Sequence, residues 1–192
     1  AAGCASAPSN AAVVVNAPPT IVSTTATPST VCAGEPSQLQ VNLPAAVPYC
    51  TTINFTSDTE PISNVTFADI NNSSGCPINA DADLQDFTSV VGNVVAGNVY
   101  GMTCSGNTGG SFTTFFTAFF DWDQNGTFEA SQAIGSINNT VCVATATNNV
   151  TVPASAKNGN TRMRVVKNYN SSPTDPCGTY GFGQAEDYTL NV

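Results

Sequence analysis

The stretch SFTTFFTAFFDWD, residues 111–123, decides the fold class of this 192-residue chain. Its side chains alternate with a period of two, which is the spacing of a β-strand. The odd-numbered face carries Phe115 and Phe119, so we expect a central strand with both faces covered. The even-numbered face is largely aromatic and consists of Phe112, Thr114, Phe116, Ala118, Phe120 and Trp122.

Shorter alternating runs surround this stretch, at residues 63–70, 98–104, 160–168 and 185–192. In the run 160–168, Met163 and Val165 share one face and are expected to point inward, whereas Arg162 and Arg164 point outward. Asn-Gly and Gly-Gly pairs separate the runs, and such pairs favour turns. The pattern predicts an all-β chain in which residues 49–192 form an antiparallel β-sandwich or jelly-roll-like domain.

Residues 1–48 differ from the rest because they are rich in proline and carry one charged residue, Glu35. Extended stretches are expected at residues 12–16, 20–27 and 37–43. Three strands of this length bury too little apolar surface to fold alone, so this N-terminal extended β segment must pack on something else. It is either a linker or fragment of a longer multidomain chain, or an arm whose strands complete a sheet in a neighbouring subunit.

Composition excludes several classes of function. The net charge is −9, with four cationic residues and no histidine. Four cations cannot neutralise a phosphate backbone, which argues against nucleic-acid binding. Without histidine there is no Ser-His or Cys-His nucleophile and no His-ligated zinc. No run of eighteen apolar residues is present, so we expect no membrane insertion.

Seven cysteines stand at positions 4, 32, 50, 76, 104, 142 and 177, without any C-x-x-C spacing. Wide, scattered spacing predicts structural disulfides formed in an oxidising compartment. Because seven is odd, at least one cysteine is unpaired, bridges to another copy, or has its partner in sequence not shown here.

The acidic turn after the central strand predicts a calcium site. Residues 121–126 read DWDQNG, which places oxygen ligands at loop positions 1, 3 and 5 and glycine at position 6, as in the first half of an EF-hand loop. The ligands would be the side chains of Asp121, Asp123 and Asn125 and the carbonyl of Thr127. Gln132 occupies position 12, so the closing carboxylate must come from Glu129 or from a residue distant in sequence. The alternative is a solvated Asn-Gly hairpin without metal.

Several blocks of the chain carry a family resemblance, at residues 62–67, 70–75, 86–89, 121–128, 161–165 and 176–188. Together they resemble the GEVED domain over about residues 49–192. One departure is Gln184, which stands where the family has its first glutamate. Residues 1–48 are similar to part of a bacterial immunoglobulin-like surface repeat.

The resemblance implies a secreted or cell-surface bacterial β-sandwich module that is not itself a catalyst. It favours calcium at the acidic turn and makes Glu186 and Asp187 candidates for the distant closing carboxylates. The alternative for these two acids is charge pairing with Arg162 or Arg164.

The resemblance also bears on the cysteines. Family members commonly carry a Tyr-Cys pair at the start and a Pro-Cys-Gly near the end, which implies a Cys50–Cys177 bridge. We expect a second bridge between Cys76 and Cys104. The remaining cysteines, which would be unpaired or intersubunit, are Cys4, Cys32 and Cys142.

Three functions are compatible with these observations to different degrees. The first is an extracellular structural or adhesive module that associates with itself or with other domains of a surface or filament protein. The second is a carbohydrate-binding module that uses aromatic rings, for which the candidates are Tyr100, Trp122, Tyr169 and Tyr180. A two-carboxylate enzyme is disfavoured, because acids crowded at one turn fit metal binding better than acid–base chemistry.

Overall fold

A computed structural model describes residues 23–42, 48–138 and 142–192. The chain divides into two units, Ala1–Ala46 and Val47–Val192. Each unit is described by itself. The predicted strand at residues 12–16 and Cys4 lie outside the described residues.

The described part of the N-terminal unit is a two-stranded antiparallel hairpin of β1 (Ser23–Thr27) and β2 (Gln38–Asn42). These strands fall within the predicted stretches 20–27 and 37–43. Every residue of β1 is exposed, and Leu39 of β2 is also exposed. The hairpin therefore buries little apolar surface, as expected for an isolated pair of strands.

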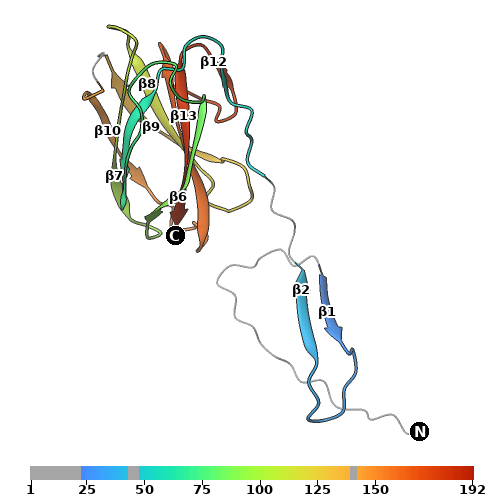
Figure 1. Cartoon of the computed structure of the whole chain (residues 1–192). Coiled ribbons are helices and arrows are strands. Elements are labelled where there is room, and N and C mark those ends of the chain that lie inside the picture. The colour runs from blue at the N-terminus through green and yellow to red at the C-terminus, as the bar shows by residue number, and fades with distance from the viewer. Residues whose placement is uncertain (1–22, 43–47, 139–141) are drawn as a thin grey trace. The chain divides into compact units, whose positions relative to one another are not determined.

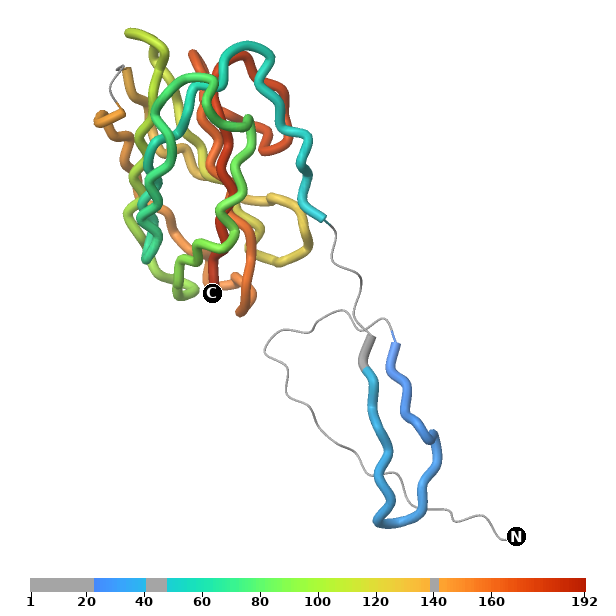
Figure 2. Tube along the Cα trace, in the orientation of Figure 1, coloured from blue at the N-terminus to red at the C-terminus, as the bar shows by residue number. Residues whose placement is uncertain are grey.

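The second unit, called here the sandwich domain, contains two main sheets, of which strands β6 to β10 and β13 are labelled in Figure 1. The chain path through this domain can be followed in Figure 2. One sheet has the order β10 (Thr145–Thr151), β7 (Val99–Gly106), β4 (Ile62–Phe67) and β5 (Ile70–Ser73). The other has the order β6 (Leu84–Asn93), β13 (Gly183–Asn191), β11 (Asn160–Tyr169), β8 (Thr114–Phe120) and β9 (Ala130–Ile137).

The all-β sandwich fold is confirmed, and no helix occurs among the described residues. Accordingly, the described part contains no apolar helix of membrane-spanning length. Pairing within the two main sheets is antiparallel except between β13 and β6, which run parallel. Two short strands, β3 (Asn54–Phe55) and β12 (Thr179–Tyr180), pair in parallel and form a separate two-stranded sheet.

The hydrophobic core fills the space between the two sheets. Four even-numbered residues of the central stretch point into it, namely Phe116, Ala118, Phe120 and Trp122, and Trp122 stacks on Phe120 with ring centroids 4.7 Å apart. Phe112, which was expected on the same face, is 50% exposed because it precedes β8 and lies outside this core. Met163 and Val165 of β11 also point inward, as predicted. β8 lies between β11 and β9, and residues on both of its faces are buried, as Phe116 and Phe119 show. The expectation of a central strand with both faces covered is therefore confirmed.

The outer face of the five-stranded sheet carries a second, smaller core. Phe119, Val166 and Ala185 on this face pack against Ile53 and Phe55. The latter two belong to residues 48–58, called here the strap, which crosses this face. Arg164 points away from the main core as predicted, but it is fully buried because the strap covers it. An outward position on this sheet is therefore not a solvent position.

Candidate metal centre

The turn at residues 121–129, called here the ligand turn, begins where β8 ends. The buried carboxylate of Asp121 accepts hydrogen bonds from the backbone N–H groups of Asn125 (3.1 Å) and Gly126 (2.9 Å). Gly126 has φ +88°, a left-handed conformation that favours glycine. The sequence thus folds the turn around its first aspartate.

Glu129 closes the same turn from its far end. Its Oε1 accepts the backbone N–H groups of Trp122 (2.5 Å) and Asp123 (3.2 Å). Asp121, Asp123 and Glu129 each place one carboxylate oxygen within 4.8 Å of the other two. Of the two sources considered for the closing carboxylate, the local one, Glu129, lies at the turn.

The residues present fit a hard divalent cation. All candidate side chains offer oxygen, which is the donor that Ca²⁺ prefers. Asp123 Oδ1 is buried and has no hydrogen-bond partner, a costly arrangement that a cation would relieve. Burial raises the pKa of Glu129, and the nearby charge of Asp121 raises it further. Asn125 Oδ1 is engaged inside the turn, since it accepts the N–H (2.8 Å) and the hydroxyl of Thr127.

Tyr49 of the strap is a member of this site that sequence reasoning missed. Its hydroxyl donates to Asp121 Oδ2 at 2.5 Å, across 72 positions of sequence. Burial, followed by this hydrogen bond, raises the pKa of Tyr49 to about 12. The distant residue that reaches Asp121 is therefore a hydrogen-bond donor from the strap.

The assignment of Glu186 as a distant ligand is wrong for the described structure. Its carboxylate is buried and accepts the hydroxyls of Ser74 (2.6 Å) and Tyr188 (2.5 Å). Burial raises the pKa of Glu186 to about 7, although both hydroxyl donors oppose the shift. Alternation explains its place: Glu186 and Tyr188 share the face of β13 that packs against the four-stranded sheet.

Asp187 is likewise not at the ligand turn but forms ion pairs with Arg162 and Arg164. These three residues are called here the arginine clamp. Arg162 Nη1 lies 2.7 Å from Oδ2. Arg164 binds both carboxylate oxygens, with Nε 2.6 Å from Oδ1 and Nη2 2.8 Å from Oδ2. Arg164 and Asp187 face each other directly in the β11–β13 register. The alternative of charge pairing is the one that the structure supports.

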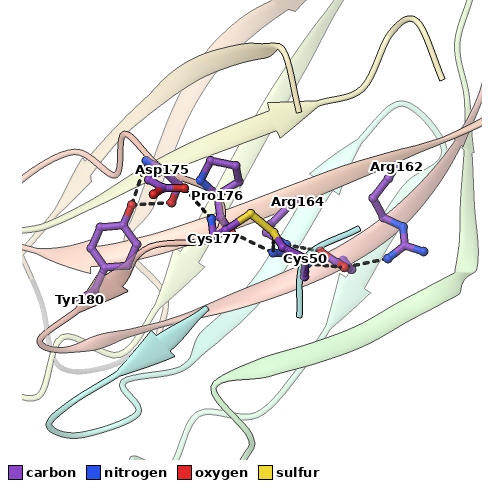
Figure 3. The surroundings of a disulfide bond; sticks show 8 residues. Cys50, Arg162, Arg164, Asp175, Pro176, Cys177 and Tyr180 are labelled. Atoms are coloured by element: carbon purple, nitrogen blue, oxygen red, sulfur yellow. Dashed lines mark hydrogen bonds and ion pairs between the residues drawn. A yellow bond between two sulfur atoms is a disulfide. The ribbon is translucent and has the colours of Figure 1, made fainter. Parts of the chain in front are cut away.

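The buried Arg164 also holds the strap and the Cys177 loop (Figure 3). Its Nη2 donates to the Cys50 carbonyl and its Nη1 to the Pro176 carbonyl, each at 2.8 Å. Nη1 also contacts Cys50 Sγ at 3.3 Å. With the two bonds to Asp187, all five N–H groups of the guanidinium have acceptors.

A comparison with family models matches residues 115–191 to the GEVED domain. These residues make up less than half of the chain, and over them the chain is similar to the GEVED domain. The match runs from β8 to β13 and so includes the ligand turn and the arginine clamp, whereas the strap lies before it. No curated protein matches the chain. The similarity of residues 1–48 to an immunoglobulin-like repeat stays a prediction.

Two disulfides hold the sandwich domain. The bridge Cys50–Cys177, implied by the family resemblance, is confirmed, with a Cα–Cα distance of 6.0 Å. The expected Cys76–Cys104 bridge is wrong, because Cys76 pairs with Cys142 at a Cα–Cα distance of 6.2 Å. Cys142 is therefore neither unpaired nor intersubunit. Cys32 is exposed in the N-terminal unit.

Strand alternation explains why Cys104 is not in a bridge. It lies two residues after Met102 on β7, and the same periodicity that buries Met102 carries Cys104 into the main core. There it is an unpaired, fully buried thiol whose pKa is raised by burial. Cys76 follows β5 and Cys142 precedes β10, so both lie outside the strands, where they pair.

The buried Glu186 predicts a pH dependence of stability. Its folded pKa of about 7 lies above the unfolded value of 4.5, so its stabilising contribution is present below pH 4.5 and is lost as the pH rises through 7. The shift corresponds to about 3 kcal/mol. We expect Glu186→Gln to be more stable than the unmodified chain above pH 7, by up to that amount, and similar to it near pH 4.

Urea unfolding from pH 4 to pH 8 measures this effect as the difference in unfolding free energy between the two proteins. Glu35→Gln, which removes an exposed carboxylate from the N-terminal unit, is the matched control and should show no such dependence. A difference for Glu186→Gln that stays constant across this range would show that Glu186 does not titrate as inferred.

Proposed function

We propose that this chain is an extracellular structural or adhesive module of a bacterial surface or filament protein, held in shape by disulfides and by Ca²⁺ at the ligand turn. GEVED domains are extracellular, and the two disulfides agree with an oxidising location. On this proposal the module performs no catalysis and acts by maintaining its fold and presenting its surface.

The arginine clamp is the observation that carries the proposal. The chain has only four cationic residues, and three of them are in ion pairs: Arg162 and Arg164 with Asp187, and Lys167 with Glu60. Arg164 and Lys167 are fully buried. Arg164 holds the strap and the Cys177 loop, and Lys167 holds the loop before β4, which is the role expected in a structural module.

A protease assay tests the proposal. We expect the oxidised, calcium-loaded chain to resist digestion, and reductant together with a chelator to make it susceptible. Equal resistance in both conditions would contradict a function that rests on the disulfides and the metal.

The aromatic candidates for carbohydrate binding do not form one platform. Trp122 is in the main core, Tyr180 stacks on Phe55, and Tyr100 packs on Phe67. Tyr169 lies elsewhere, between Phe112 and Phe182. These four rings therefore do not form a shared surface on which a carbohydrate could stack.

Calcium should stabilise the sandwich domain measurably. At a hundredfold excess over Kd, a ligand that binds only the native state adds about 2.7 kcal/mol. For a domain of this size that corresponds to a rise in Tm of about 5–10 °C. We expect differential scanning calorimetry to show this rise on adding Ca²⁺ and its reversal by EGTA.

Two variants show whether the rise comes from the ligand turn. Asp121→Ala should abolish it, but that change also removes acceptors of backbone N–H groups. Asp123→Asn is the cleaner variant, because Asp123 Oδ1 has no partner in the turn. Glu35→Gln should retain the full response. A calcium-dependent rise that survives both turn variants would place the ion elsewhere.

A further inference from the structure

A cavity of about 270 Å³ lies at the end of β11 where Tyr169 is located, away from the ligand turn. Its lining residues are Glu60, Phe112, Tyr169 and Phe182. They come from four separate segments: the loop before β4, the loop before β8, the last residue of β11, and the loop between β12 and β13. The three aromatic residues are called here the aromatic cage.

Tyr169 stands nearly perpendicular to each of the other two rings of the aromatic cage. Tyr169 meets Phe112 at 5.7 Å and 81°, and it meets Phe182 at 5.9 Å and 87°. Backbone hydrogen bonds fix these segments, since Tyr169 N–H donates to the Phe182 carbonyl and Asn170 N–H to the Thr113 carbonyl. Phe112 is 50% exposed and Tyr169 37% exposed, so the cage is accessible to solvent.

Glu60 supplies the charge of the cavity. It is 4% exposed, and its Oε2 lies 3.1 Å from Nζ of the fully buried Lys167. The same Nζ donates to the Glu60 carbonyl. This ion pair fixes the carboxylate through Oε2, and Oε1 lies beside the turn that contains Gly109.

The Gly109-Gly110 turn makes room for this arrangement. A Cβ at position 109 would lie 2.6 Å from Glu60 Oε1, and one at position 110 would lie 2.7 Å from the Phe112 ring. Gly109 also has φ +66°, which disfavours other residues. The two glycines thus allow the backbone to approach both the acid and the aromatic wall.

We propose that the aromatic cage and Glu60 form a binding site for an alkylammonium group. Aromatic faces attract cations, and an ionised carboxylate oxygen accepts hydrogen bonds without donating any. The net charge of −9 also favours the approach of a cation. The volume lies below the range of about 300–1,000 Å³ typical of drug-sized ligands, so it suits a head group or one side chain better than an oligosaccharide.

Isothermal titration calorimetry with choline and with 3,3-dimethyl-1-butanol tests the proposal without altering the protein. The two molecules have nearly the same shape, but only choline is charged. We expect saturable choline binding, with the neutral analogue at least about tenfold weaker. Equal affinities, or no saturable binding of choline, would overturn the proposal.

Variants locate the binding. Tyr169→Ala and Phe112→Ala each remove one exposed wall and should weaken choline binding about tenfold. Val99→Ala, which removes an exposed apolar side chain outside the cavity, should leave binding unchanged. Binding that is insensitive to both cage variants would overturn the assignment to this site.

A second pair of probes distinguishes two sources of an alkylammonium group, a quaternary head group and a lysine side chain. Tighter binding of tetramethylammonium than of butylammonium would indicate a quaternary head group, and the reverse order would indicate a lysine side chain. Either result supports an alkylammonium site. Binding of neutral monosaccharides in preference to both cations would overturn it in favour of sugar recognition.

Discussion

Asp187→Ala should destabilise the sandwich domain by about 3–5 kcal/mol, the cost of breaking a buried ion pair by removing one partner. Arg164 is fully buried and binds both oxygens of Asp187 at 2.6 and 2.8 Å. Without that carboxylate, its charge remains inside the protein with only carbonyl and sulfur acceptors. Urea unfolding at pH 7, followed by near-UV circular dichroism, measures the loss.

Asp86 offers a matched control, because it is paired with Asp187 in the β6–β13 register but is exposed. We expect Asp86→Ala to cost less than about 1 kcal/mol. The double variant Arg164→Met with Asp187→Leu should be more stable than Asp187→Ala alone, because no unpaired charge is left. If Asp187→Ala costs no more than Asp86→Ala, the arginine clamp does not stabilise the fold.

The central strands could be predicted from sequence because both of their faces are buried. β8 and β11 lie inside the five-stranded sheet, and their apolar residues recur at every second position. β13 also has partners on both sides and was predicted within two residues of its start. A polar residue on either buried face of such a strand would lose core contacts. The apolar pattern of these strands is therefore strong in the sequence.

The strands of the two main sheets that were not predicted, β5, β6, β9 and β10, are all edge strands. β10 reads TATNNVT and buries only Ala146 and Val150. An edge strand has one hydrogen-bonding side open and tolerates polar residues along most of its length. Its sequence therefore resembles a loop, and its pairing is decided by neighbours that are distant in the chain.

The ligand turn could be predicted from local spacing because Asp121, Asp123 and Glu129 lie within nine residues. Spacing carries no such information about Tyr49 or the arginine clamp, whose partners are 72 and 23 positions away. Glu186 and Asp187 are neighbours in sequence with opposite environments, because successive side chains of β13 face the main core and the strap. That separation follows from the sheet, which the motif alone does not specify.

Replacing Cys50 and Cys177 by serine should lower the stability of the sandwich domain at least as much as Asp187→Ala does. The bridge closes a loop across 127 positions, and the chain-entropy account gives about 5 kcal/mol for that length. The Cys76–Cys142 bridge, which spans 66 positions, is the matched control, with about 4 kcal/mol expected. Calorimetric unfolding of the two double-serine variants under oxidising conditions measures both losses.

Loop length alone predicts a small difference between the two bridges, but Arg164 adds a second effect at only one of them. Its guanidinium donates to the carbonyls of Cys50 and Pro176 and contacts Cys50 Sγ, so the bridge and the arginine clamp position the same segment. We therefore expect the loss of Cys50–Cys177 and Asp187→Ala to be non-additive, with a coupling of about 1–3 kcal/mol. The Cys76–Cys142 loss and Asp187→Ala should add. Additive losses for both bridges would show that the strap is held by the disulfide independently of the buried arginine.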